Sequence, residues 1–104
     1  MKTLMIVARA YMMSELERLL NDNGITAYSI INKVLGKGKT GKVHESMFDT
    51  GHTGFNLMIF AVLPSDHADR AVSALKVFHG AQVKGSHGEP IPFKLFSFPC
   101  EELI

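Results

Sequence analysis

Apolar residues gather along the chain in short runs, and their spacing predicts alternating strands and helices. Residues 3–9 form a continuous apolar run of strand length. The apolar residues that follow repeat at helical spacing and predict a helix over about 11–23 with one buried stripe. That stripe consists of Met12, Leu16, Leu19 and Leu20.

Both ends of this helix carry sequence signals. Ser14 followed by Glu17 is the pattern of a capping box, in which the hydroxyl and the carboxylate satisfy free backbone N–H groups of the first turn. Gly24 suits the left-handed conformation that commonly follows a helix. We therefore expect the chain to leave the helix at this glycine.

The remaining strands are predicted from β-branched and aromatic residues. Residues 25–35 and 55–63 predict the second and third strands, and Pro64 ends the third. Residues 91–98 predict a fourth strand, and the tail after it is too short to form another element.

A second helix is expected between the third and fourth strands. Ser65 or Asp66 is predicted to cap its beginning, and Gly80 is predicted to stop it after about Phe78, which leaves a polar loop over 79–90. Its predicted buried stripe consists of Ala68, Val72, Leu75 and Phe78.

The order strand, helix, strand, strand, helix, strand predicts an α+β fold of a single domain, residues 1–104. Two right-handed strand–helix–strand units give a ferredoxin-like βαββαβ plait, a four-stranded antiparallel sheet with both helices on one face. The third strand is apolar at nearly every position, and the fourth carries phenylalanines on both sides. Since the helices cover one face only, we expect the other face to be buried by self-association; the alternative is that long side chains fold over the sheet.

Composition narrows the class of protein. The chain has 104 residues, of which 46% are hydrophobic and 20% charged, which is typical of a globular domain. The formal net charge of +1 and the lack of an aromatic-rich basic motif argue against a nucleic-acid partner. A single cysteine argues against a disulfide framework and a multi-cysteine zinc site. No apolar run reaches membrane-spanning length and no signal-peptide cleavage pattern occurs, so a cytoplasmic location is expected.

The segment between the second and third strands carries the candidate chemistry. It contains five glycines over residues 36–54 and is predicted to be a loop, and a loop this long is usually functional or disordered. Glycines let backbone N–H groups approach an anion, and the surrounding lysines supply positive charge. These lysines are Lys33, Lys37, Lys39 and Lys42, with Lys84 in the later loop. The spacing of a Walker loop is absent, and a solvated hairpin loop is the alternative interpretation.

The residues GITAYS (24–29), the run IINKVLGKGK that follows, and the ending VLPSD of the third strand resemble the P-II signalling proteins and their P-II-like relatives. The element order resembles the family over most of the chain, and the specific motif covers about residues 24–42. The resemblance implies a homotrimer of plaits with their sheets facing inward. It also implies that residues 37–54 are a mobile arm that contacts a target protein, and that a nucleotide binds in the cleft between subunits.

The resemblance also assigns roles to single residues. It places Ser29 near an adenine ring, matches the glycines of the arm's base, and puts Lys39 where an arginine handles phosphate. A second loop before the last strand supplies backbone N–H groups and one lysine. The implied nucleotide or anion site consists of Ser29, Gly36, Lys37, Gly38, Lys39, Lys84, Gly85 and Gly88. Its expected ligand is ADP, AMP or ATP, with bicarbonate as a further candidate and no required cofactor.

Some positions depart from the family's pattern. Thr40 stands where the family has a glutamine that helps hold magnesium and 2-oxoglutarate, which puts a 2-oxoglutarate response in doubt. The arm contains no tyrosine to be uridylylated, and the late arginines that grip phosphate across the interface are missing. The sequence therefore predicts a divergent P-II-like protein.

The predicted function is that of a non-enzymatic trimeric regulator. Ligand binding would switch the arm, which contacts an unidentified partner protein such as a membrane transporter. Met47 and Phe48, an apolar pair within the polar arm, are expected to contact this partner or the trimer's own flank. No catalytic set of residues is evident.

Metal sensing is the alternative function. His44 and His52 lie in the arm near Glu45 and Asp49, and imidazole with carboxylate can bind a transition metal. The divalent-cation tolerance proteins, which share the trimeric plait, would then be the model for a role beside heavy-metal efflux.

Overall fold

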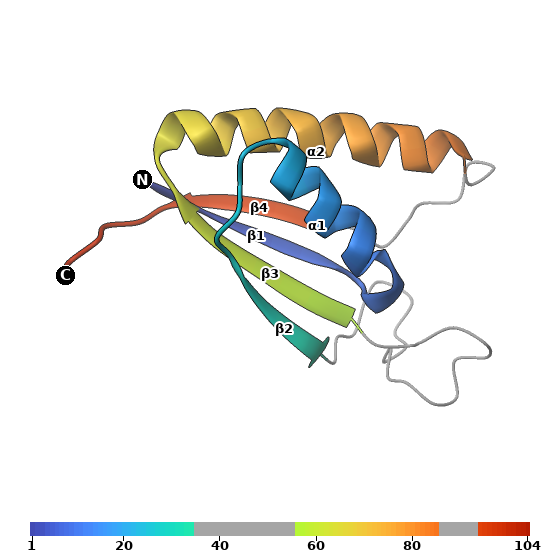
Figure 1. Cartoon of the computed structure of the whole chain (residues 1–104), viewed down its shortest axis with the longest axis horizontal. Coiled ribbons are helices and arrows are strands. Elements are labelled where there is room, and N and C mark those ends of the chain that lie inside the picture. The colour runs from blue at the N-terminus through green and yellow to red at the C-terminus, as the bar shows by residue number, and fades with distance from the viewer. Residues whose placement is uncertain (35–55, 86–93) are drawn as a thin grey trace.

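Four strands form one antiparallel sheet in the order β2–β3–β1–β4, and both helices lie on the same side of it (Figure 1). The strands are β1 (Lys2–Arg9), β2 (Ser29–Val34), β3 (Asn56–Leu63) and β4 (Lys94–Pro99). A short 3-10 turn, η1 (Ala10–Met12), leads into α1 (Met13–Asp22), and α2 (Ser65–Gly85) follows β3. This computed structural model describes residues 1–34, 56–85 and 94–104. The predicted ferredoxin-like plait is confirmed.

The core lies between the helices and one face of the two central strands. Alternate residues of β1 and β3 point to the helices and are buried, as their period of two requires. Each large apolar side chain buried here stabilises the fold by about 1.5–3 kcal/mol. The core residues of the strands are Leu4, Ile6, Ala8, Leu57, Ile59, Ala61 and Leu63. Those of the helices and their ends are Met12, Leu16, Leu20, Ile25, Ala68, Ala71 and Leu75.

The predicted capping box at Ser14 is wrong. The N-cap of α1 is Met12, with φ −85° and ψ −2° and no side-chain hydrogen bond, so Ser14 lies inside the helix. The cause is η1, which winds the chain before α1 begins: the N–H of Met13 donates to the Ala10 carbonyl. A continuous backbone turn here replaces the side-chain cap.

The predicted end of α1 at Gly24 is confirmed. Gly24 has φ +81°, its N–H donates to the Asn21 carbonyl at 3.1 Å, and the N–H of Ile25 donates to the Leu20 carbonyl at 2.9 Å. These two bonds form a Schellman motif, and Ile25 packs in the core together with Leu20. Because Ile25 completes the helix cap, β2 begins only at Ser29 and is shorter than the predicted strand 25–35.

Neither Ser65 nor Asp66 caps α2. The carbonyl of Pro64 accepts the N–H of Ala68 at 3.0 Å, so the helix already includes Ser65 and places Asp66 in its first turn. A carboxylate there is favoured by the positive end of the helix dipole. The predicted buried stripe is largely confirmed, with Ala71 as an addition and with Val72 and Phe78 only half buried.

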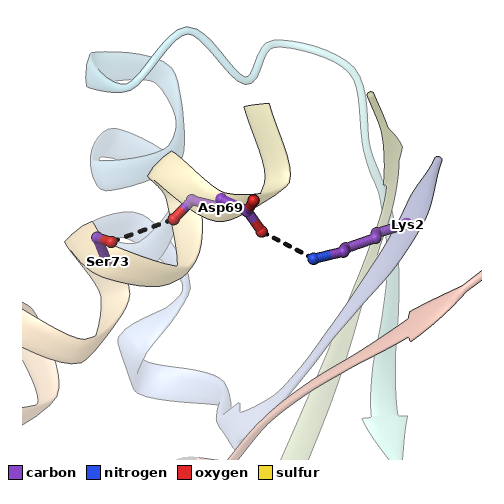
Figure 2. A network of polar contacts seen from close by, with 3 residues as sticks. All are labelled: Lys2, Asp69 and Ser73. Carbon is purple, nitrogen blue, oxygen red and sulfur yellow. Dashed lines mark hydrogen bonds and ion pairs between the residues drawn. The ribbon is translucent and has the colours of Figure 1, made fainter. Parts of the chain in front are cut away.

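One polar contact joins the first half of α2 to the start of β1. The Nζ atom of Lys2 lies 2.8 Å from Oδ1 of Asp69, and the Ser73 hydroxyl donates to the backbone carbonyl of Asp69 at 3.2 Å (Figure 2). Both charged side chains are exposed, so the pair contributes less than about 1 kcal/mol. It links the helix to the strand and adds little to the stability of the fold.

The predicted stop of α2 at Gly80 is wrong, because the helix continues to Gly85. The loop expected over 79–90 is therefore helical in its first part. Gly80 keeps a helical backbone, and no atom would lie within 4 Å of an added Cβ. A glycine inside a helix costs only about 1 kcal/mol, and Ala81, which follows it, is a strong helix former that offsets part of this cost.

The fourth strand and the tail agree with the sequence where the structure describes them. β4 runs over Lys94–Pro99, while residues 91–93 of the predicted strand lie outside the described residues. Residues 100–104 form neither helix nor strand, as expected. Among the residues described, no helix combines the length and apolar character needed to cross a membrane.

Replacing the two helix-associated glycines by alanine should change stability in opposite directions. Gly24→Ala places a Cβ at positive φ and should lower the free energy of unfolding by about 1 kcal/mol. Gly80→Ala should raise it by about 0.5–1 kcal/mol, since helical alanine is favoured and the space is open. Urea unfolding of both variants measures the difference. A stabilised Gly24→Ala would contradict the Schellman assignment.

Candidate functional site

The two segments predicted to bind an anion attach to the same end of the sheet. Residues 35–55 follow Val34 and precede Asn56, and these two residues are register partners across β2 and β3. Residues 86–93 follow α2 and precede Lys94, which pairs with Val7 near the end of β1. The chain thus joins both predicted loops to one end of the sheet, which we call the loop end (Figure 1).

A bulge interrupts β2 where it approaches the loop end. Ile31 pairs with Met58 and Val34 pairs with Asn56, so β2 has one more residue than β3 across this interval. Lys33, within the bulge, has φ +59°, which costs a residue with a Cβ about 1–2 kcal/mol. Bulges redirect the strand that carries them. This conformation sets the direction in which the chain leaves the sheet, and no signal in the sequence pointed to it.

Basic residues gather at the loop end. Arg9 closes β1 beside Asn56 and is only 7% exposed. Lys33 lies on the bulge and Lys94 begins β4, and Glu15 lies in the first turn of α1. Among the residues that the structure describes at this end, these three cations outnumber the carboxylate of Glu15. The local field favours an anion at this end of the molecule.

A cleft opens between α2 and β4 on the same end. Its volume is about 240 Å³, and it is lined by Leu75, Lys76, His79, Lys94 and Leu95. We call it the α2–β4 cleft. The sequence did not indicate this cleft, because the loop predicted over 79–90 included His79, whereas in the structure His79 belongs to the longer α2 and lines the cleft together with Leu95 of β4.

The face of the sheet away from the helices carries a largely apolar surface, which we call the open face. Met5 lies opposite Phe60 on one side and Phe96 on the other, and in the next row Val62 and Phe98 lie on either side of Thr3. The exposed fractions are 53% for Val62, 47% for Phe96 and 42% for Phe98. The long side chains therefore do not cover this face within one chain. An apolar surface of this kind usually marks an interface.

Ser29, the residue predicted near an adenine ring, opens β2 opposite Phe60 and is exposed. It lies five positions before Val34, at the end of the strand far from the bulge. This corresponds to roughly 16 Å along an extended chain. The hydroxyl is thus available on an edge strand, away from the glycines of the arm.

Tyr28 precedes Ser29 and is half buried against the core. Burial raises the pKa of the Tyr28 phenol above its usual value of 10.0, and the negative charge of Glu17 and a hydrogen bond with Glu17 raise it further. The contact joins α1 to the segment that enters β2. Deprotonation of the phenol would place two negative charges next to each other.

Most of the predicted site residues lie outside the described residues. These are Gly36, Lys37, Gly38, Lys39 and Gly88 of the anion site, Met47 and Phe48 of the partner contact, and His44 and His52 of the metal hypothesis. Lys84 and Gly85 lie in the last turn of α2. The described residues contain no group of three or more potential metal ligands. His67 lies near Asp66 at 3.9 Å, on the exposed start of α2.

Comparison with known proteins identifies the family. A family model described as nitrogen regulatory protein P-II matches residues 1–102. The chain belongs to the P-II family. The resemblance seen at residues 24–42 is thereby confirmed, and with it a place among regulatory signalling proteins. No curated protein sequence matches the chain.

Solved structures share the P-II fold. CPII, a nitrogen regulatory PII-like protein from Thiomonas intermedia bound to ADP, AMP and bicarbonate, is 22% identical, with a TM-score of 0.69 over 93% of this chain and 82% of that one. The same protein bound to ADP and bicarbonate gives 20% identity and a TM-score of 0.68 over the same shares. A putative PII-like signalling protein from Thermus thermophilus is 13% identical, with a TM-score of 0.57 over 93% and 83%. At these identities the similarity establishes the fold.

Within this P-II fold, the Tyr28–Glu17 contact should give a measurable alkaline titration. In a Tyr11→Phe background, Tyr28 is the remaining tyrosine, and its phenolate absorbance should appear with a pKa above 10.0. Glu17→Gln should lower that pKa, but not fully, because burial is the first cause. Stability should fall as the pH rises above 10.0, since the native state then holds the proton more tightly than the unfolded state.

Tyr28→Phe is the control for the stability measurement, because it should remove this part of the alkaline loss. An unshifted phenol in the Tyr11→Phe protein would show that the contact with Glu17 does not form in solution.

Proposed function

We propose that this protein is a non-enzymatic cytoplasmic regulator that works as a homotrimer. In this proposal an adenine nucleotide binds in the cleft between subunits, near the base of the arm. Binding orders the arm, residues 37–54, and the ordered arm engages or releases a partner protein. A regulatory role agrees with family membership, since P-II proteins are regulators.

The observation that carries the proposal is the shared attachment of both predicted loops at the loop end. The glycine- and lysine-rich arm leaves the sheet after Val34, beside Asn56, and the second loop joins the sheet at Lys94. Backbone N–H groups of glycines together with lysine side chains suit phosphate groups. Arg9 and Lys33 add positive charge from the sheet itself.

The solved relatives support a nucleotide as the ligand. CPII from Thiomonas intermedia has been captured with ADP, AMP and bicarbonate, and with ADP, AMP and acetate. In this chain, we assign phosphate binding to Gly36, Lys37, Gly38 and Lys39, together with Lys84 and Gly85 at the end of α2 and Gly88 after it. We assign Ser29 to the adenine ring. Lys39 supplies a point charge without the bidentate geometry of arginine. Bicarbonate is the second anion that the proposal includes.

The arm switches because the ligand binds its ordered state more tightly than its disordered state. A ligand shifts the arm toward its ordered state only by as much as it prefers that state. Met47 and Phe48 then form the apolar contact with the partner, for which a membrane transporter is the class we favour. An apolar pair at the tip of a polar arm gives the ordered state a surface that the disordered state does not present.

The open face supports the trimer. Its apolar rows leave side chains such as Phe96 and Val62 about half exposed in one chain. Packing three such faces together removes them from water and yields about 25 cal/mol for each Å² of apolar surface buried. It also brings neighbouring subunits together beside the loop end.

The trimer has a direct test on the open face. Sedimentation equilibrium should give a mass three times the 11.5 kDa of one chain. Phe96→Lys should shift the mass toward that of one chain, because it places a charge in the middle of the interface. Val77→Lys is the matched control, since Val77 is 74% exposed on α2 and should leave the trimer intact. Single chains in the unaltered protein would remove the cleft that the function needs.

The nucleotide is tested by calorimetry with AMP, ADP and ATP, each with and without bicarbonate. Lys39→Ala should weaken binding by about 1.5–3 kcal/mol, a factor of about 10 to 150, if its ammonium makes a charged hydrogen bond. Lys2→Ala is the control, because Lys2 pairs with Asp69 at the opposite end of the sheet. Absence of binding by all three nucleotides at millimolar concentration would overturn the nucleotide claim.

A further inference from the structure

The short link between α1 and β2 is anchored at both of its ends. Residues 25–28 form neither helix nor strand. At the start of the link, Ile25 closes the Schellman motif of α1 and is buried in the core. At its end, Tyr28 packs against the core, and its phenol forms a hydrogen bond with Glu17 of α1. The two residues between these anchors are exposed, so the anchors determine where the chain reaches the sheet.

The contact between Tyr28 and Glu17 ties the end of the link to a helix that is itself held in place. Both side chains are half buried, so the phenol donates to a charged carboxylate that is partly shielded from water. Hydrogen bonds to charged acceptors are stronger than those between neutral groups. On either side of Glu17 along α1, Leu16 and Leu20 are buried in the core. The acceptor is therefore carried on a fixed element.

Ser29 follows this anchor directly. It is the first residue of β2, which is an edge strand in the sheet that the structure describes. Its register partner is Phe60, and because Ile30 packs against the core, the alternation of the strand places Ser29 on the open face. The end of an edge strand opens easily, since few hydrogen bonds hold it. The position of the Ser29 hydroxyl therefore depends on how firmly the residue before it is held.

We propose that Tyr28, through its hydrogen bond with Glu17, is a positioning residue for the nucleotide site. This role rests on the proposed function, in which Ser29 contacts the adenine ring. Tyr28 lies on the helix side of the sheet and does not contact the ligand. It holds the start of β2, so that the Ser29 hydroxyl keeps one place on the open face. The adenine then meets a group that is already ordered, which reduces the entropic cost of binding.

Calorimetry with ADP on the full chain tests this role. Ser29→Ala should weaken ADP binding about two- to ten-fold, as the loss of one neutral hydrogen bond implies. Tyr28→Phe keeps the ring in the core and removes the phenol oxygen, and it should weaken ADP binding at least about two-fold. Tyr11→Phe is the matched control, because it removes the same group from a side chain that is 57% exposed and should leave the affinity unchanged.

A double-mutant cycle separates positioning from a general loss of structure. In the Ser29→Ala protein, Tyr28→Phe should have no further effect on ADP affinity, because the hydroxyl that it positions is gone. An equal loss in both backgrounds would show that Tyr28 acts on the fold as a whole and would overturn the proposal. Glu17→Gln keeps an acceptor for the phenol and should retain more of the affinity than Glu17→Ala. Equal affinities in these two variants would also overturn it.

Hydrogen exchange in the ligand-free protein provides a measurement that does not depend on ADP. Tyr28→Phe should speed the exchange of the amides of residues 29–31 at least about three-fold, because the anchor before them is lost. Unchanged exchange there would overturn the anchoring role. Absence of ADP binding by the unaltered chain would overturn the proposed function and this role together. ADP binding that does not respond to Tyr28→Phe would overturn the positioning role alone.

Discussion

A four-stranded sheet has two faces, and two helices on one side can cover only one of them. In this chain both faces of the central strands are largely apolar, so a single chain leaves apolar side chains of the open face in contact with water. Val62, Phe96 and Phe98 illustrate the consequence, because each remains about half exposed. Burying this second face is what links the fold to the trimer that we propose, and the seams of that trimer are where the proposed ligand would bind.

The connections between elements decide where the functional segments lie. The Schellman motif at Gly24 returns the chain from α1 to the sheet, and the bulge at Lys33 directs it away again. The extension of α2 to Gly85 carries the second segment to the same end as the first. Two segments that are distant in sequence are thus both joined to the loop end of the sheet.

Charge is distributed unequally between the two ends of the sheet. At the end opposite the loops, Lys2 is matched by Asp69 at 2.8 Å. Among the described residues of the loop end, Arg9, Lys33 and Lys94 outnumber Glu15, and the α2–β4 cleft lies at the same end. The net charge of +1 conceals this asymmetry, because it sums over the whole chain. Anion binding depends on the local field and not on the total.

The amino-acid sequence determined the element order, the plait, the left-handed Gly24 and the family, because hydrophobic period and glycine placement are local properties. It also indicated that both sheet faces would be apolar. The tertiary structure alone decided the start of α1 at η1, the passage of α2 through Gly80, the bulge at Lys33 and the cleft beside Leu95. These features depend on contacts between segments far apart in the chain, and such contacts override weak local signals such as a serine at a helix start or a glycine within a helix.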